Sequence, residues 1–389
     1  MPLNKRRLLA AAALAGIAPM ARAAPALRIG LIASYTGVYA DYGRQFDAGV
    51  ALYLAGQGGR IAGRPVEIVR RDTGGPAPDA ARRLAQELAV RERVDLLAGL
   101  DFSPNAYAVA PVATQARLPT LVMNASSSGI TASSPYLARV SFTVQQVSAP
   151  MARWMLGNGQ REAYLVVADY APGADALAAF RQAFEAGGGR IAGELRTPLQ
   201  NLDFAAYVQR IRDARPQAVF FFFPSGVMPT AFLKAWRERG MAQAGIGLYA
   251  TGEATDDSYL DATGDLALGL VTSHHYSYAH PSAMNRRFVQ AFEARFGNTL
   301  RPSYFAVAAY DALAAIDLAL RRTGGDAGGE RFMEALKGLA FESPRGPIEI
   351  DAATRDIVQT VYIRRTERVD GRLVNVEFDR FERVKDPGR

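Results

Sequence analysis

Polar side chains that could hold a small anion follow two strand-like runs in the first third of the chain. After VDLLAG the sequence reads LDFSPNAY, in which Ser103 is placed to cap a helix and Pro104 to occupy its first position. The first amides of such a helix can bind a carboxylate. After PTLVMN, Asn124 precedes the hydroxyls of Ser126 and its neighbours. Each group alone fits a simple cap or turn equally well, but together at neighbouring strand ends they favour a carboxylate pocket.

Residues for covalent or metal chemistry are scarce. The chain has no cysteine, and it lacks the serine-nucleophile elbow, the phosphate loop, the dinucleotide fingerprint and the H-E-x-x-H motif. The three histidines are His274, His275 and His280; the first two are adjacent, so on a strand they point to opposite faces and cannot readily bind one metal together. Asp256 and Asp257 lie in a TDDS turn, where acids usually cap helices or face solvent. We therefore expect no enzyme activity, no cofactor and no metal.

Composition indicates a globular protein that does not bind nucleic acid. The 389 residues are 49% hydrophobic and 21% charged, enough for two or three cores. The 45 basic residues are scattered among 38 acids without a basic stripe. The formal net charge is +7, and four of these cations lie within the first 23 residues, so the remainder carries a mild +3.

The first 23 residues predict a signal peptide. Lys5, Arg6 and Arg7 precede the apolar run 8–18, and Ala21-Arg22-Ala23 matches a signal-peptidase site. The apolar run is far shorter than the roughly 20 residues that span a bilayer. Arg6-Arg7 is also compatible with twin-arginine export. We expect cleavage after Ala23 and a mature protein in the periplasm.

From Ala24 onward, short buried strands alternate with amphipathic helices, which predicts parallel sheets covered on both faces. The pattern begins again near residue 163, and the pentamer GRIAG occurs at 59–63 and 189–193, in equivalent places of the two halves. Two similar α/β lobes are therefore expected. The expected strands are 27–33, 64–70, 94–99, 119–124, 163–168, 189–195, 217–223, 246–250, 347–351 and 357–365, and the later helices lie near 148–158, 282–296, 303–322 and 329–338.

Six short motifs, spread over essentially the whole mature chain, carry a family resemblance. The sequence resembles the periplasmic substrate-binding proteins of branched-chain amino acid ABC transporters, the Leu/Ile/Val-binding type. The motifs, in order, are GLIASYTGVYADYG (30–43), LDFS (100–103), NASSSGIT (124–131), DYAPGADA (169–176), TGEATDD (251–257) and SPRGPIEID (343–351). A subset with DYxPG and SPRGP looks most similar, and several of its members are associated with aromatic or other small carboxylates.

The resemblance implies a type I periplasmic binding fold, with two Rossmann-like lobes and a three-crossover hinge. We place the crossovers near 143–146, 272–277 and 352–358. The implied N-terminal lobe is 24–143 plus 277–352, and the C-terminal lobe is 144–276 plus 353–389. In such a protein, ligand binding shifts an open population toward a closed one that the permease reads.

The resemblance also assigns ligand contacts by matching positions. In the first lobe these are Tyr42, Ser103, Asn124 and Ser126. The remaining implied contacts are the acidic partner of a ligand ammonium at Glu253, Tyr310 on a C-terminal helix, and Tyr170. In the leucine binders of this family, two tyrosines of the second lobe close over the ligand. The matching positions in this chain lie near Ala171–Pro172 and Pro224–Ser225 and hold no aromatic residue, although Tyr170 is one residue away.

The expected ligand is a small carboxylate, most simply an amino acid whose ammonium would neutralise Glu253. An aromatic acid remains the alternative. The expected partner is an ABC transporter membrane permease, and the protein is expected to be a monomer. A periplasmic sensor would share the same site without a permease, whereas a hydrolase would need a nucleophile and a base that the sequence does not offer.

Overall fold

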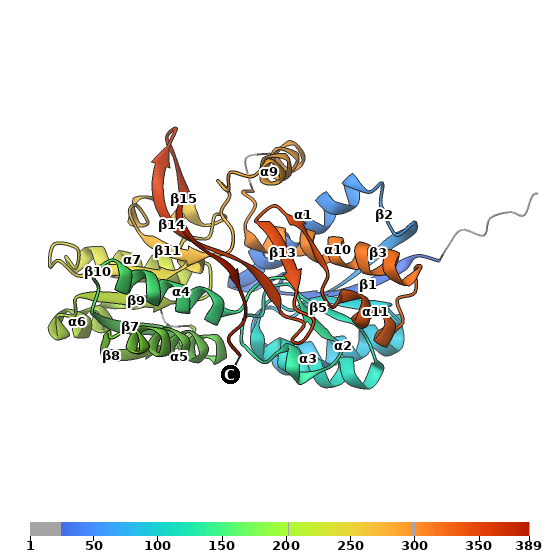
Figure 1. Cartoon of the computed structure of the whole chain (residues 1–389), viewed down its shortest axis with the longest axis horizontal. Helices are drawn as coiled ribbons and strands as arrows, with labels where there is room; N and C mark the ends of the chain where they lie inside the picture. Colours follow the sequence, from blue (N-terminus) through green and yellow to red (C-terminus); the bar gives the residue numbers. More distant parts are fainter. Residues whose placement is uncertain (1–24, 201, 298–299, 389) are drawn as a thin grey trace, which may run out of the picture.

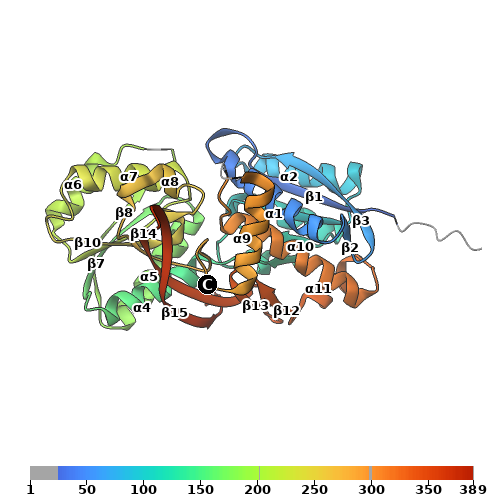
Figure 2. The ribbon, with the colours of Figure 1, turned by 90° about the horizontal axis from the view of Figure 1, so that it is seen from above.

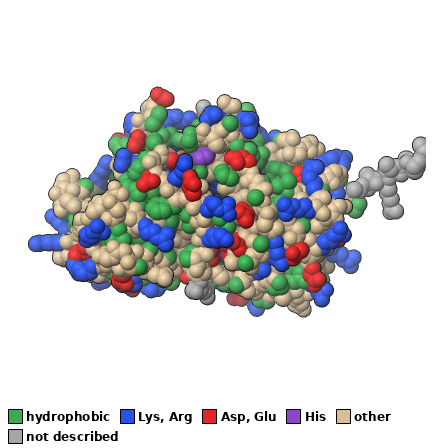
Figure 3. All heavy atoms as spheres, in the orientation of Figure 1, with side chains coloured by type: hydrophobic (Ala, Val, Ile, Leu, Met, Phe, Trp, Pro, Cys, Tyr) green, Lys and Arg blue, Asp and Glu red, His purple; other side chains and the backbone are tan. Residues whose placement is uncertain are grey.

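The computed structural model describes residues 25–200, 202–297 and 300–388, and the predicted signal peptide lies outside them. Two α/β lobes lie next to each other (Figure 1), which confirms the predicted fold class. No helix in the described part of the chain is long and apolar enough to cross a membrane. Basic and acidic side chains are interspersed over the face seen in Figure 3.

The first lobe is built on a six-stranded sheet in the order β2-β3-β1-β4-β5-β6. Helices α1 and α10 pack together on one face, and α2 and α3 pack together on the other (Figure 1). The strands are β1 (Leu27–Ala33), β2 (Arg60–Ile61), β3 (Arg64–Asp72), β4 (Leu96–Gly99), β5 (Thr120–Val122) and β6 (Leu137–Arg139). The helices are η1 (Gly37–Tyr39), α1 (Ala40–Gly56), α2 (Pro78–Glu87), η2 (Leu88–Glu92), α3 (Ser103–Ala116), η3 (Thr131–Ser133), α9 (Ala283–Phe296), α10 (Tyr304–Thr323) and α11 (Gly329–Leu336).

The second sheet runs β12-β13-β14-β11-β10-β9-β7-β8, and β15 pairs with β14 outside this path. Seen from above, α6 and α7 lie on one face of it and α4 and α5 on the other (Figure 2). The strands are β7 (Glu162–Ala168), β8 (Arg190–Thr197), β9 (Ala218–Phe222), β10 (Gly247–Thr251), β11 (Val271–His274), β12 (Ala340–Ser343), β13 (Gly346–Ile350), β14 (Ile357–Val369) and β15 (Arg372–Val384). The helices are α4 (Val144–Gly157), α5 (Ala171–Ala186), α6 (Ala205–Ala214), α7 (Val227–Glu238), η4 (Gly252–Thr255), α8 (Leu260–Thr263) and η5 (Gly264–Leu266).

Burial of the central strands on both faces explains their continuous apolar runs. Every residue of β9, sequence AVFFF, is buried, as is every residue of β4. Such strands need helices on both sides of the sheet, which the βα alternation supplies. The carboxyl ends of β4, β5, β9 and β10 consequently form the edges from which the site is built.

Strand β15 is an element that the sequence analysis missed. It forms a long antiparallel hairpin with β14 that projects from the second lobe (Figure 1). The turn is Asp370-Gly371, and both residues have positive φ values, 50° and 79°, as a tight hairpin turn requires. The D-G pair between two valine-rich runs could have predicted this hairpin from the sequence.

Helix α4 begins earlier than the sequence predicted. We expected it near 148, whereas it starts at Val144 because Thr143 and Gln146 form a capping box. The Gln146 amide donates to the Thr143 hydroxyl, and the Gln146 side chain accepts from the Thr143 amide.

The predicted division into lobes and the crossover positions stay predictions. Hairpin β12–β13 contacts the first lobe yet is hydrogen-bonded to β14.

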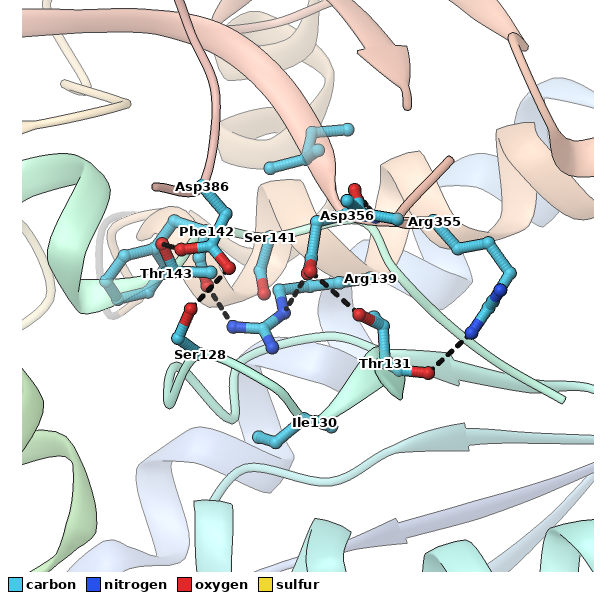
Figure 4. A network of polar contacts seen from close by, with 12 residues as sticks. Ser128, Ile130, Thr131, Arg139, Ser141, Phe142, Thr143, Arg355, Asp356 and Asp386 are labelled. Atoms are coloured by element: carbon cyan, nitrogen blue, oxygen red, sulfur yellow. Dashed lines mark hydrogen bonds and ion pairs between the residues drawn. The ribbon is translucent and has the colours of Figure 1, made fainter. Parts of the chain in front are cut away.

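A buried polar network fixes the segment that leads from β6 to α4 (Figure 4). The Arg139 guanidinium is fully buried and pairs with Asp356 at 2.9 Å. It also donates to the carbonyls of Ser127 (2.7 Å) and Phe142 (3.1 Å). Asp356 in turn accepts from the Thr131 hydroxyl at 2.8 Å. One cation thus holds the loop after β5 and the crossover in a single arrangement.

Candidate functional site

A nearly closed cavity of about 20 Å³ lies between the two lobes. This is far below the roughly 300–1,000 Å³ typical of small-molecule sites, so the lobes must move apart to admit a ligand of that size. Its lining comes from strand ends and helix starts of both lobes, as expected for open parallel sheets. The lining residues are Tyr42, Asp101, Phe102, Ser103, Asn124, Ser126, Phe142, Tyr170, Pro172, Phe222, Pro224, Ser225, Glu253 and Tyr304.

The structure brings six of the seven residues proposed from the sequence to this cavity. They are Tyr42, Ser103, Asn124, Ser126, Tyr170 and Glu253. None lies at the outer surface of a lobe. They come from both lobes, so a ligand that touches all of them must be enclosed between the lobes.

Tyr310 lies elsewhere, and its placement in the site is corrected. Its ring packs against Tyr53 and Phe288, with ring centroids 5.1 and 5.4 Å apart. Tyr304, the first residue of α10, is the aromatic residue of that helix that lines the cavity. The two positions are six residues apart, which is about 9 Å along a helix and about a third of a turn around it.

Ser103 does not cap helix α3 with its side chain, contrary to the sequence prediction. The helix begins at Ser103 itself, and its N-cap is Phe102. The Ser103 hydroxyl instead accepts a hydrogen bond from the Ser127 amide at 3.0 Å. It therefore ties the loop after β5 to the start of α3, and its own proton stays available to an acceptor in the cavity.

The first-lobe floor also presents buried acceptors. The Asn124 amide donates to the Asp101 carbonyl at 2.7 Å, and one Asp101 carboxylate oxygen accepts from the Ser34 amide at 2.8 Å. Among the side-chain atoms described, Asn124 Oδ1 and Asp101 Oδ1 are buried with no hydrogen-bond partner. Burial raises the pKa of Asp101 to about 6.

Aromatic rings form most of the remaining wall. Tyr42 stacks on Phe102 at 5.6 Å and on Phe305 at 4.1 Å. On the second-lobe side, Tyr170 stacks on Phe222 at 6.0 Å with only 11° between the rings. Rings held in this way offer flat faces to a planar apolar ligand.

Glu253 is the charged side chain of the second-lobe wall. It lies in η4, directly after β10, and its side chain is 4% exposed. Burial raises its pKa to about 7, an effect that the Thr251 side chain, the Glu253 backbone amide and, least of the three, the Arg364 cation only partly oppose. Within the described residues its Oε2 makes no hydrogen bond, and the closest ring nitrogen is Nε2 of His274 at 3.8 Å. No lysine or arginine lines the cavity as it is described.

Several lining residues were not found from the sequence. Phe222 ends a strand, and Asp101, Phe102 and Ser225 come two or three residues after one, so the strand-end rule that found Asn124 could have found them. Phe142 carried no comparable signal, because its place depends on how the two lobes meet. Over the described ranges, no group of three or more His, Asp or Glu side chains could hold a metal ion.

Comparisons with known proteins agree with this geometry. Residues 26–371 match the family model described as "Periplasmic binding protein". The chain is 40% identical over 385 residues to the Leu/Ile/Val-binding protein homolog 6 of Brucella melitensis, covering 99% of both chains.

Two solved structures of Rhodopseudomonas palustris solute-binding proteins are also similar. One, from strain BisB5, is in complex with 3,4-dihydroxybenzoic acid; it is 46% identical, with a TM-score of 0.89, and the match covers 93% of this chain and 99% of that one. The other is in complex with 4-hydroxybenzoate; it is 37% identical, with a TM-score of 0.90, covering 94% and 99%. These relatives are solute-binding proteins of ABC transporters. The chain belongs to the periplasmic binding protein family, and it is a substrate-binding protein of an ABC transporter.

Proposed function

We propose that this protein binds an aromatic carboxylic acid that carries a ring hydroxyl, of the hydroxybenzoate type, and delivers it to an ABC permease. The observation that carries the proposal is the composition of the cavity wall. Stacked aromatic rings surround a small space that has serine hydroxyls on the first-lobe side and the buried Glu253 on the other. Two similar solute-binding proteins hold 3,4-dihydroxybenzoic acid and 4-hydroxybenzoate, which supports this ligand class.

The ligand carboxylate would lie at the floor of the first lobe. There the Ser103 and Ser126 hydroxyls and the first amides of α3 can donate to it without a basic side chain. The ring would lie between the aromatic side chains, and its hydroxyl would donate to Glu253. Closing the lobes brings these contacts together, so binding favours the closed form.

A second candidate is an amino acid, which one observation favours. Glu253 is a buried carboxylate whose Oε2, within the described chain, has no hydrogen-bond donor, and a ligand ammonium would supply one. The Brucella relatives are named as Leu/Ile/Val-binding protein homologs. The stacked aromatic rings of the wall favour the planar acid over a branched aliphatic side chain.

A ligand panel separates the two candidates. The protein is unfolded in guanidinium, dialysed and refolded to remove any bound solute, and its melting temperature is then measured with each compound. We expect 4-hydroxybenzoate or 3,4-dihydroxybenzoate to raise the melting temperature by a few degrees, because a ligand specific for the folded state stabilises it. A rise with leucine, isoleucine or valine, and none with the aromatic acids, would overturn the proposal in favour of the second candidate.

We further propose that the mature protein is a periplasmic monomer that begins after Ala23. Mass spectrometry of the exported protein should show the N-terminus at Ala24. Light scattering should give the mass of a single chain, with and without ligand. A dimer that forms only with ligand would contradict the monomer proposal.

A further inference from the structure

A buried pair, Glu253 and His274, lies at the end of two neighbouring parallel strands of the second lobe. Strands β10 and β11 are in register at Thr251 and Ser273, so the residues that follow them lie next to each other. Glu253 forms part of the cavity wall, whereas His274 does not line the cavity. His274 is completely buried. The imidazole is therefore a layer behind the carboxylate.

The two side chains face each other through atoms that have no other hydrogen-bond partner. His274 Nε2 lies 3.8 Å from Glu253 Oε2, slightly beyond hydrogen-bond length. In the part of the chain described, neither of these atoms, nor His274 Nδ1, makes a hydrogen bond. Buried polar atoms normally have partners, because leaving them without one is costly. A small inward movement of Glu253 would join the pair.

The backbone makes room for this arrangement at one position. Gly252 lies between β10 and Glu253, and a Cβ there would overlap Cβ of His274 and the guanidinium of Arg364. Only glycine at this position lets the imidazole lie directly behind the carboxylate. The pair therefore depends on local sequence as well as on the strand register.

The surroundings keep His274 neutral and fix its ring. Burial, and next the Arg364 and Arg345 cations, lower the pKa of His274 well below 6.5. Its ring contacts Phe142 at 5.1 Å and Tyr304 at 4.6 Å, both of which line the cavity. A neutral imidazole has one ring N–H, so it can donate one hydrogen bond to a carboxyl group and hold that group in one orientation.

We propose that His274 is a specificity-determining positioning residue, which holds one oxygen of Glu253 so that the other receives the ring hydroxyl of the ligand. This inference rests on the proposed function, and it adds the residue that makes the site distinguish hydroxylated from unsubstituted benzoates. Without His274, the Glu253 carboxyl group would have no fixed orientation toward the ligand. Benzoate, which has no ring hydroxyl, would bind without using the pair.

The test compares the affinities of 4-hydroxybenzoate and benzoate, measured by calorimetry on refolded protein. The wild type is expected to prefer 4-hydroxybenzoate at least about tenfold. His274→Leu should reduce this preference about tenfold while changing benzoate affinity by less than about threefold. His274→Gln, whose amide can still reach Glu253, should keep most of the preference.

The neighbouring His275 supplies a matched control. It is also completely buried and stacks on Phe142 at 4.8 Å, but it does not approach Glu253 within ion-pair distance. His275→Leu should change the affinity for both acids by a similar factor. If His274→Leu does not fold, His274→Asn serves in its place, because the shorter amide cannot reach Glu253 and should also lose the preference.

Two failures can be told apart. If the wild type binds neither aromatic acid but binds an amino acid, the proposed function falls, and this inference falls with it. If the wild type prefers 4-hydroxybenzoate and the preference is unchanged in both His274→Leu and His274→Asn, only the role of His274 is overturned.

Discussion

The hydroxyl of Tyr42 donates a hydrogen bond to the backbone carbonyl of Ser225 at 2.7 Å, and this bond joins the two lobes across the cavity. Tyr42 belongs to α1 in the first lobe, and Ser225 follows β9 in the second. Both residues line the cavity. Because the bond joins the two lobes, it stabilises their arrangement around the cavity and not either lobe alone.

Removing this bond should weaken ligand binding without unfolding the protein. Tyr42→Phe is expected to reduce affinity between about twofold and tenfold, because a neutral hydrogen bond contributes roughly 0.5–1.5 kcal/mol. Calorimetry measures the affinity, and small-angle scattering measures the closed fraction. Tyr53→Phe is the control, since the Tyr53 hydroxyl donates to Asp317 within the first lobe. Equal losses of affinity in both variants would contradict a role in closure.

The stability of the unliganded protein should depend on pH through Glu253. Its pKa in the folded state is about 7, above the ordinary 4.5, because burial disfavours the charged form. The folded state therefore binds the proton more tightly, and stability falls as pH rises from about 4.5 to 7, then levels off. Glu253→Gln should remove up to about 3 kcal/mol of this fall. Urea unfolding at pH 5 and pH 8 measures it, and identical slopes in wild type and variant would refute the assignment.

A side chain at position 252 should disrupt the second-lobe wall. Gly252→Ala is expected to lower stability by roughly 1–3 kcal/mol, as overpacking does, because the added Cβ overlaps His274 and Arg364. Gly157→Ala is the control, since a Cβ at Gly157 meets no atom within 4 Å. Thermal and urea unfolding measure both. A Gly252→Ala protein as stable as the control would show that the wall adapts.

Breaking the buried ion pair of Figure 4 should be severe. Asp356→Asn would leave the fully buried Arg139 without its counter-charge, which typically costs about 3–5 kcal/mol. Asp79→Asn removes a partner of the exposed Arg82 instead and should cost less than about 1 kcal/mol. Urea unfolding compares the two variants. Similar losses would mean that Arg139 finds other acceptors.

The covered sheet of each lobe could be predicted because the composition of the central strands shows that they are buried on both faces. A run such as AVFFF has no polar side, so it requires a sheet covered on both faces. Strand β15 was missed because its second half is rich in charged residues and largely exposed, which resembles a polar surface segment. Its only strong signal was the Asp370-Gly371 turn.

The site could be predicted where it depends on strand ends and not where it depends on contacts between lobes. Ser103, Asn124 and Glu253 follow strands of their own lobe, and the structure brings them to the cavity. Tyr304 and Phe142 reach it only through the packing of α10 and the crossover, which no local pattern encodes. The closeness of His274 to Glu253 depends on the register of β10 and β11, which is likewise absent from a single sequence.

Strand β14 constrains how the molecule can open. Its first residues, 357–358, pair with β13, which lies over the first lobe, and residues 362–365 lie between β11 on one edge and β15 on the other, both of the second lobe. Sliding one lobe past the other would break this ladder of amide bonds, whereas a swing about the strand would bend it and leave it intact. Fluorophores attached across the mouth should therefore separate widely on ligand release, while a pair beside β14 should keep its spacing.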